Sequence, residues 1–271
     1  MAKSSSTTPG KPKRSEWRET LGFLVKLALV VFIFRSFVLS PFSIPSESML
    51  PRLLIGDYLF ISKWNYGYSR HSLPLSLPLI PGRVFGSTPA RGDVVVFKAP
   101  PGNKADYIKR VIGQPGDTIQ MLRGRLILNG KPVPKQRVAD FIVPITPNYG
   151  CEGQFQDEVG GKPVCRYPQF RETLPNGKSY NVLDRGYFPQ ADDTGVYTVP
   201  AGHLFMMGDN RDASADSRFP AVEGEAIGMV PLENVEGKAL VGFWSTDGNA
   251  RWLLPWTWFT AARWNRIGMG F

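Results

Sequence analysis

A long apolar run near the N-terminus constrains this chain more than any other feature of its sequence. Residues 21–39 read LGFLVKLALVVFIFRSFVL. At 1.5 Å per residue, these 19 residues would form a helix of about 28 Å, close to the thickness of a bilayer's hydrocarbon core. Lys26 and Arg35 interrupt the run, but both lie in its outer thirds, where long basic side chains reach the headgroups. The run therefore predicts a transmembrane helix.

Two other interpretations of this run are a buried core helix and a cleaved secretory signal. Few helices of globular proteins carry large apolar residues on every face, which argues against a core helix. Val38 and Ser40 could occupy the small-residue positions of a cleavage site, but Pro41 follows directly. Proline there removes a backbone N–H and stiffens the bond to be cut. We therefore expect an uncleaved anchor.

The N-terminal tail, residues 1–20, indicates the orientation of this anchor. It carries five basic and two acidic side chains, namely Lys3, Lys11, Lys13, Arg14, Arg18, Glu16 and Glu19. By the positive-inside rule, such a tail lies in the cytoplasm. The rest of the chain then lies on the other side of the membrane, which is the periplasm if the source is Gram-negative.

The overall charge and the rare residue types exclude several classes of protein. A net charge of +9 suits a nucleic acid or an anionic membrane surface, and the expected topology argues against a nucleic acid. The chain has two histidines, His71 and His203, and no HExxH motif. Its two cysteines cannot build a four-cysteine zinc site. We expect no metal, no cofactor and no nucleic-acid partner.

Beyond the anchor, the local patterns favour β-strands. Short runs of β-branched and aromatic residues, bounded by Gly, Pro or Asp, predict strands at residues 57–62, 93–98, 106–112, 118–128, 195–199, 203–207 and 238–244. Asn129-Gly130 follows one of these runs and predicts a hairpin, since both residue types tolerate the positive φ of a type I′ turn. The predicted fold is mostly β, with a single N-terminal transmembrane helix and an inserted smaller lobe.

The predicted core covers residues 40–132 and 195–250, and the polar, Gly- and Pro-rich residues 133–194 form the inserted lobe. Within the core, residues 63–90 contain four prolines and indicate a long apolar loop. The lobe holds Cys151 and Cys165, which either pair in an oxidising compartment or remain as two buried thiols. Residues 251–271 are rich in Trp and Arg, so they either contact lipid headgroups or close the β core.

Ser48 and Lys109 are the residues that could form a nucleophilic pair. Ser48 stands between Pro45 and Pro51, nine residues past Leu39, and therefore close to the membrane. Such a serine is ordinarily a turn residue. Lys109 lies in a predicted strand and is either a solvent-facing lysine or, if its face is the core, a buried one with a lowered pKa. A neutral lysine can take the proton of a serine hydroxyl that attacks a carbonyl, without any histidine.

A third segment, residues 208–218, is dense in short polar side chains. Asp209, Asp212 and Asp216 could supply oxygen ligands to a cation. The segment lacks the spacing of an EF-hand, however, and contains Arg211 and Arg218. Arginines among carboxylates favour an internal network of salt bridges and hydrogen bonds.

Taken together, these segments resemble the bacterial type I signal peptidases. IPSESMLPRLLIGDYLFISKW resembles the family's nucleophile motif, RGDVVVFK its next strand, YIKRVIGQPGD its lysine motif and MGDNRDASADSR its late polar motif. Their order and spacing match as well, and the resemblance runs from about residue 21 to residue 244.

The resemblance implies a role for each matching residue. Ser48 would be the nucleophile, Lys109 the general base, and the Ser48 N–H with the Ser46 hydroxyl the oxyanion hole. Ser214 would orient the lysine. Supporting residues would be Asp209, Asn210, Arg211, Asp216 and Arg218. The pockets for substrate side chains would be lined by Phe42, Ile44, Pro45, Met49, Leu53, Val96, Tyr107 and Ile108, with Asp106 beside the strand that pairs with substrate.

The implied activity is that of a serine endopeptidase of the bacterial inner membrane. It would cut signal peptides from secretory preproteins after Ala-x-Ala sites, beside the bilayer and near the export translocase. A pilin- or conjugation-dedicated relative is a weaker match, since such enzymes are often shorter and lack the lobe. A self-cleaving repressor would carry a DNA-binding domain instead of an anchor. An inactive peptide-binding scaffold would have lost Ser48 or Lys109, and both are present.

Overall fold

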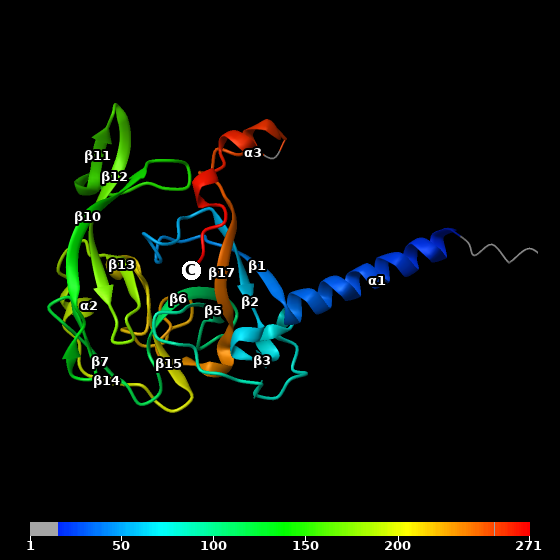
Figure 1. The fold of residues 1–271 in the computed structure, drawn as a ribbon, viewed down its shortest axis with the longest axis horizontal. Coiled ribbons are helices and arrows are strands. Elements are labelled where there is room, and N and C mark those ends of the chain that lie inside the picture. The colour runs from blue at the N-terminus through cyan, green and yellow to red at the C-terminus, as the bar shows by residue number, and fades with distance from the viewer. Residues whose placement is uncertain (1–15, 252) are drawn as a thin grey trace, which may run out of the picture.

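The computed structural model describes residues 16–251 and 253–271, and its fold is mostly β, with one long helix projecting from the body (Figure 1). This confirms the predicted fold class. Most of the basic tail predicted at residues 1–20 lies outside the described residues, as does Trp252 of the Trp-rich C-terminal segment.

Helix α1 spans Glu16–Phe37 and is the one described helix that is long and apolar enough to cross a membrane. Its side chains are exposed apart from Ser36 and the half-buried Gly22 and Phe37. The transmembrane helix predicted at residues 21–39 extends too far at its C-terminal end, because Leu39 already belongs to strand β1 and pairs with Ser62. Acidic Glu16 and Glu19 lie in the first turn of α1, where the helix dipole favours negative charge.

A seven-stranded sheet forms the centre of the body, in the order β1-β2-β17-β5-β6-β15-β16. Its strands are β1 Leu39–Ser43, β2 Asp57–Ser62, β5 Val94–Lys98, β6 Asp106–Gly113, β15 His203–Met207, β16 Val230–Pro231 and β17 Val235–Ser245. The predicted strands at 57–62 and 203–207 are confirmed, and those at 93–98, 106–112 and 238–244 differ only at their ends. Strand β1 escaped prediction because it contains Pro41, which the outermost strand of a sheet tolerates.

A four-stranded sheet with the order β14-β7-β8-β9 packs beside it. Its strands are β7 Thr118–Leu122, β8 Arg125–Leu128, β9 Lys131–Pro132 and β14 Tyr197–Thr198. The hairpin predicted at Asn129-Gly130 is confirmed, with φ of 52° and 72° at the two residues. The single strand predicted at residues 118–128 is wrong, since a turn with positive φ at Arg123 and Gly124 divides it in two.

Residues 133–194 contain a sheet that the sequence did not indicate. Its strands are β10 Lys135–Pro144, β11 Gln156–Val159, β12 Lys162–Thr173 and β13 Ser179–Leu183, followed by the short helix α2 at Pro189–Asp192. Strand β10 has mostly exposed or half-buried side chains, so it lacks the apolar signal by which a strand is recognised. A disulfide joins Cys151 to Cys165 in this part of the chain.

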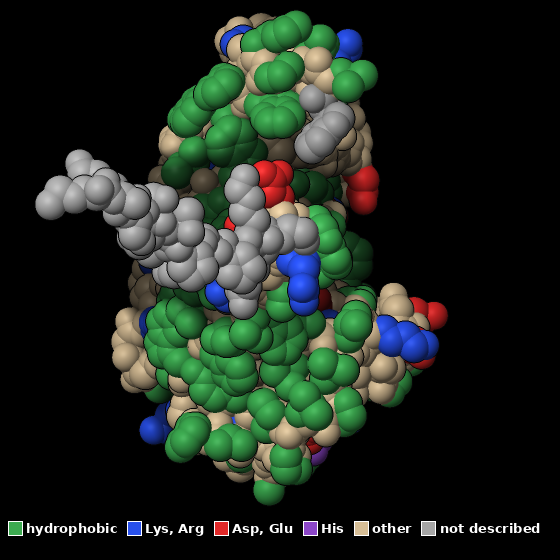
Figure 2. Space-filling model, turned by 90° about the vertical axis from the view of Figure 1, so that its right-hand side faces the viewer, with side chains coloured by type: hydrophobic (Ala, Val, Ile, Leu, Met, Phe, Trp, Pro, Cys, Tyr) green, Lys and Arg blue, Asp and Glu red, His purple; other side chains and the backbone are tan. Residues whose placement is uncertain are grey.

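The body of the protein exposes apolar side chains on the side from which α1 extends (Figure 2). The predicted loop at residues 63–90 forms only the two short strands β3 Tyr68–Ser69 and β4 Arg83–Val84 and three 3₁₀ turns, and it leaves Leu75 and Phe85 exposed. Helix α3, Trp256–Thr260, exposes Trp256 and Phe259. Figure 2 shows the molecule from the side from which α1 extends, and hydrophobic side chains gather there in its upper part and in its lower half.

Candidate active site

Ser48 lies in a tight turn that leaves strand β1 and is anchored by buried apolar neighbours. Met49 and Leu50, which follow it, are completely buried. The Leu50 N–H donates to the Glu47 carbonyl (3.0 Å), and the Leu53 N–H donates to the Met49 carbonyl (2.9 Å). Because Met49 and Leu50 cannot move without opening the core, the backbone at Ser48 is held in one place.

Lys109 approaches Ser48 from β6, a central strand between β5 and β15. Its side chain is almost completely buried, and its Nζ lies 2.6 Å from the Ser48 Oγ. Burial lowers the pKa of Lys109 to about 8, although the carboxylates of Asp216 and Asp209 act in the opposite direction. A lysine with this pKa is neutral in about a tenth of the molecules at pH 7 and in about half of them at pH 8.

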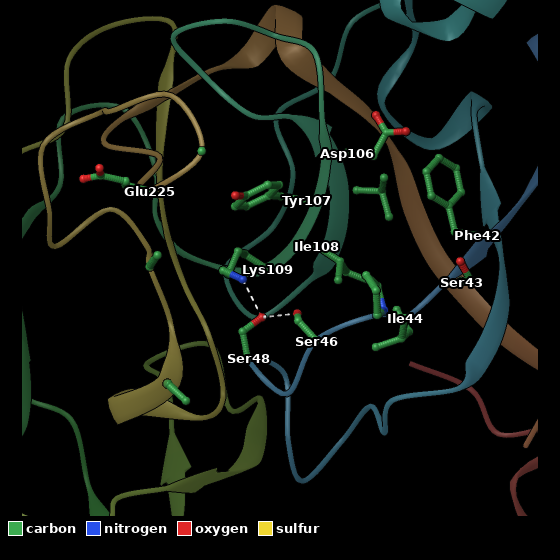
Figure 3. Close-up of a pocket in the computed structure, with 15 residues that line it drawn as sticks. Phe42, Ser43, Ile44, Ser46, Ser48, Asp106, Tyr107, Ile108, Lys109 and Glu225 are labelled. Atoms are coloured by element: carbon green, nitrogen blue, oxygen red, sulfur yellow. Dashed lines mark hydrogen bonds between the residues drawn. The ribbon is translucent and has the colours of Figure 1, made fainter. Parts of the chain in front are cut away.

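Two further side chains surround this pair (Figure 3). The Ser46 Oγ lies 3.3 Å from the Ser48 Oγ, on the side away from Lys109. The Lys109 Nζ lies 5.6 Å from the centre of the Tyr107 ring. Tyr107 and Lys109 therefore share one face of β6, as alternation along a strand requires. A hydroxyl beside the nucleophile can donate to an oxyanion that forms there.

The polar segment 208–218 holds the Ser48 turn from the opposite side. The Asn210 backbone N–H donates to the Ser48 carbonyl (3.0 Å), and the Asn210 side-chain amide donates to the Glu47 carbonyl (3.2 Å). Gly208 approaches so closely that a Cβ there would lie 2.5 Å from the Ser48 carbonyl oxygen. Glycine is required at this position because any side chain would push the two segments apart.

Buried ion pairs fix the shape of this polar segment. Arg218 pairs with Asp216 (2.8 Å) and Arg211 with Glu172 of β12 (2.6 Å). Arg110, next to Lys109 on β6, pairs with Asp209 (2.6 Å). Two of the three carboxylates considered as cation ligands, Asp209 and Asp216, are thus paired with arginines, which favours the salt-bridge network. The third, Asp212, accepts from the Arg185 backbone N–H, and burial raises its pKa to about 6.

The contact expected of Ser214, a hydrogen bond that orients Lys109, is not made. Its side chain is buried in the same group, near the Asp216 carboxylate, but no hydrogen bond joins its Oγ to Lys109 within the described part of the chain. The Lys109 Nζ bonds instead to Ser48. An orienting bond from Ser214 to Lys109 therefore remains a prediction from the family resemblance.

A pocket of about 390 Å³ opens beside the Ser48–Lys109 pair. The predicted residues that line it are Phe42, Ile44, Pro45, Ser46, Ser48, Val96, Asp106, Tyr107, Ile108 and Lys109. Met49 and Leu53 do not line it, because they are completely buried in the core behind it. The prediction missed Ser43, Ala213, Ala215, Gly224 and Glu225. Gly224 and Glu225 lie in a segment without motif or strand pattern, so only the fold could place them here.

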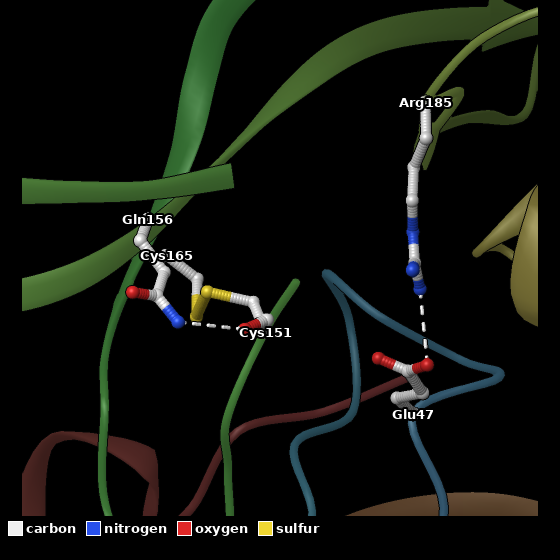
Figure 4. Close-up of a disulfide and its surroundings, with 5 residues drawn as sticks. All are labelled: Glu47, Cys151, Gln156, Cys165 and Arg185. Atoms are coloured by element: carbon white, nitrogen blue, oxygen red, sulfur yellow. Dashed lines mark hydrogen bonds and ion pairs between the residues drawn. A yellow bond between two sulfur atoms is a disulfide. The ribbon is translucent and has the colours of Figure 1, made fainter. Parts of the chain in front are cut away.

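An ion pair joins the disulfide-bearing part of the chain to the nucleophile turn (Figure 4). The Arg185 guanidinium lies 3.0 Å from the Glu47 carboxylate. The same guanidinium stacks near Tyr167, with 5.0 Å to the ring centre, and Tyr167 packs in a core cluster with both cysteines. The position of Glu47, directly before Ser48, thus depends on packing in residues 133–194.

The arrangement has the parts needed for nucleophilic attack on a carbonyl. It combines a buried hydroxyl, an amine with a lowered pKa in hydrogen-bond contact with it, a second hydroxyl nearby, and an adjoining pocket with an apolar end. A base next to a hydroxyl in this geometry is the usual requirement for a serine nucleophile.

Comparison with known proteins identifies the family of this chain. The sequence matches the model of the family described as signal peptidase, peptidase S26, over residues 17–244. Signal peptidase I of Rickettsia typhi is 37% identical over 235 residues, covering 83% of this chain and 78% of the relative. Signal peptidase I of Rickettsia felis is 34% identical over 280 residues, covering 97% of this chain and 95% of the relative.

A crystal structure of a signal peptidase I from Enterococcus faecalis V583 is 24% identical, with a TM-score of 0.29, and the match covers 56% of this chain and 97% of that chain. The sequence matches alone are sufficient to assign the family, because they extend over most of this chain and most of each relative. The chain belongs to the signal peptidase family, peptidase S26.

Proposed function

We propose that this protein is a membrane-anchored endopeptidase that removes signal peptides from secretory preproteins by means of Ser48 and Lys109. The observation that carries the proposal is the 2.6 Å contact between the Lys109 Nζ and the Ser48 Oγ, made by a lysine that is almost completely buried. Family membership supplies the reaction class.

The reaction proceeds in two steps of acyl transfer. The neutral Lys109 amine takes the hydroxyl proton as the Ser48 Oγ attacks the scissile carbonyl, and the Ser48 N–H and Ser46 hydroxyl donate to the resulting oxyanion. The C–N bond then breaks, and the Lys109 ammonium returns its proton to the leaving amine. A water molecule, deprotonated by Lys109, then attacks the acyl–serine ester. The bond from the carbonyl carbon to the Ser48 Oγ breaks, the Lys109 ammonium returns the proton to the Ser48 Oγ, and the signal peptide leaves as a free acid.

The apolar end of the pocket supports specificity for small side chains before the cut. Phe42, Ile44, Val96 and Ile108 line this end, and an Ala-x-Ala segment in extended form would place two methyl groups against them. The extended substrate would run beside β1 and β6, in the manner of an added strand. Asp106 lies at this end and forms an ion pair with Lys98, with 2.5 Å between the Lys98 Nζ and the carboxylate.

Helix α1 and the apolar side chains exposed on the same side of the molecule support the proposal that the enzyme acts at a membrane surface. Ser48 follows closely on the end of α1, so the site would lie near the bilayer surface, outside the cytoplasm by the positive-inside rule. Exposed tryptophans such as Trp256 and Trp264 suit the headgroup layer. Preproteins emerging from the export translocase would meet the site there.

The test is cleavage of a preprotein whose signal ends in Ala-x-Ala, in detergent or lipid. Wild type, Ser48→Ala and Lys109→Ala are compared, with circular dichroism as the control for folding. We expect cleavage by the wild type only. Undiminished cleavage by either folded variant would contradict the assignment.

A further inference from the structure

We infer that Glu225 selects for a basic side chain among the first residues of the mature protein, directly after the cleaved bond. This inference rests on the proposed function and extends it to the side of the substrate that is not the signal peptide. It begins from the shape of the pocket, which continues past the reactive pair to a second end. Glu225 lies at that end, and Gly224 precedes it in the chain and also lines the pocket (Figure 3).

The two ends of the pocket lie on opposite sides of the nucleophile. In Figure 3, Phe42, Ile44 and Asp106 lie on one side of the Ser48–Lys109 contact, and Glu225 lies on the other. If the apolar end takes the small side chains before the cut, the chain after the cut must leave past Glu225. Three other residues that line the pocket, Ala213, Ala215 and Gly224, have little or no side chain, which leaves room in it for a peptide.

Glu225 lies on a tight turn that also carries Glu223, and the two carboxylates differ in their contacts. The Val222 N–H donates to the Ala226 carbonyl (2.9 Å), and the Glu225 N–H donates to the Val222 carbonyl (3.0 Å). Glu223, on the same turn, pairs with Lys104 (2.7 Å). Glu225 lines the pocket instead and makes no ion pair or side-chain hydrogen bond within the described part of the chain.

The charges of the pocket therefore differ between its ends. At the apolar end, Asp106 is neutralised by Lys98. At the other end, the Glu225 carboxylate is unpaired, so a cationic side chain arriving there gains attraction and an anionic one meets repulsion. Because Glu225 is exposed, the expected preference for Lys over Gln is about two- to fivefold. The preference should disappear in 1 M salt, where screening acts over about 3 Å.

The experiment measures kcat/KM of the full-length enzyme in detergent on preproteins that carry Lys, Gln or Glu at each of the first three mature positions. We expect the order Lys, Gln, Glu at one or more of these positions. Glu225→Gln should remove this order, and Glu225→Lys should reverse it. Glu223→Gln is the matched control, since it removes a charge from the same turn but not from the pocket, and it should keep the wild-type order.

Two results would overturn the inference: equal kcat/KM for all three residues at every position, or a charge preference that persists in both Glu225 variants. Failure of the proposed function is a separate outcome, because the Gln-bearing reference substrate would then not be cleaved in a manner that depends on Ser48.

Discussion

Two lysines of this protein are equally buried, yet their surroundings give them opposite chemical characters. Lys63, just after β2, and Lys109, on β6, are 2% and 4% exposed. The Lys63 Nζ lies 2.8 Å from the Glu236 carboxylate. The Lys109 Nζ has a neutral partner, the Ser48 hydroxyl. One amine is thus part of a buried ion pair, and the other is buried without a counterion of its own.

The difference shows that burial alone does not produce a base. Carboxylates stand near Lys109 as well, but Asp209 and Asp216 are held by Arg110 and Arg218. Because the arginines neutralise them, these carboxylates only partly offset the desolvation that lowers the pKa of Lys109 to about 8. The buried arginines near the site therefore help to keep the pKa of the reactive amine low.

The largest expected effect is the loss of catalysis on replacing the unpaired lysine. Lys109→Met should lower kcat/KM at least about 10³-fold, since members of a nucleophile–base pair act as a unit. Methionine fills much of the same space without a charge, so the variant should fold. The measurement is preprotein cleavage alongside a melting curve in detergent. If the Lys109→Met enzyme were active, Lys109 would not be the base, and the two buried lysines would not differ in chemical role.

The paired lysine should show the opposite behaviour, a loss of stability with chemistry retained. Lys63→Met leaves the Glu236 carboxylate buried without its main partner, which should cost about 3 kcal/mol. The melting temperature should fall clearly, while kcat of the folded fraction stays near the wild-type value. Lys63→Met/Glu236→Leu removes both charges and should regain most of the stability. Wild-type stability in the single variant would contradict a structural role for the pair.

Ser46 tests whether the second hydroxyl acts in the transition state. Ser46→Ala should lower kcat about 10²-fold with little change in KM, as expected for the loss of one oxyanion donor. Ser46→Thr keeps the hydroxyl and should recover much of the rate. An effect confined to KM would assign Ser46 to substrate binding instead.

The pH profile tests the environment of Lys109 directly. Its pKa is lowered to about 8, so the neutral base predominates above that pH and is progressively lost below it. The value of kcat/KM should rise about tenfold per pH unit up to about pH 8 and then level off. A rise that continues to about pH 10 would indicate an unshifted lysine and would contradict the argument from burial.

The smallest expected effect concerns the ion pair between Glu47 and Arg185. Glu47→Gln should lower kcat about two- to fivefold, because the turn bearing Ser48 loses a charged contact at a partly exposed position. Arg166→Met is the control, since it breaks an exposed ion pair with Asp157 away from the site and should not change kcat. Equal effects of the two variants would show that Glu47 has no particular role in positioning Ser48.

Local patterns were sufficient for the parts of the fold that depend on neighbouring residues. The apolar anchor, the strands at residues 57–62 and 203–207 and the Asn129-Gly130 hairpin follow from composition and turn chemistry. Strand β10 was missed because its exposed polar residues hide the alternation on which prediction depends, and β12 was missed because its buried and half-buried residues do not alternate. Strand β1 was missed because its proline is acceptable only at the edge of a sheet.

The sequence by itself determined which residue types were available near the proposed site: a serine between prolines, a lysine within a strand, and a polar segment of carboxylates and arginines. The tertiary structure decided which of them meet. Ser48 and Lys109 are 61 residues apart in the chain, and their contact depends on β6 lying in the centre of the sheet. Only long-range packing distinguishes Lys109 from Lys63 and places Glu225 in the pocket, because desolvation and charge depend on neighbours that the linear order does not specify.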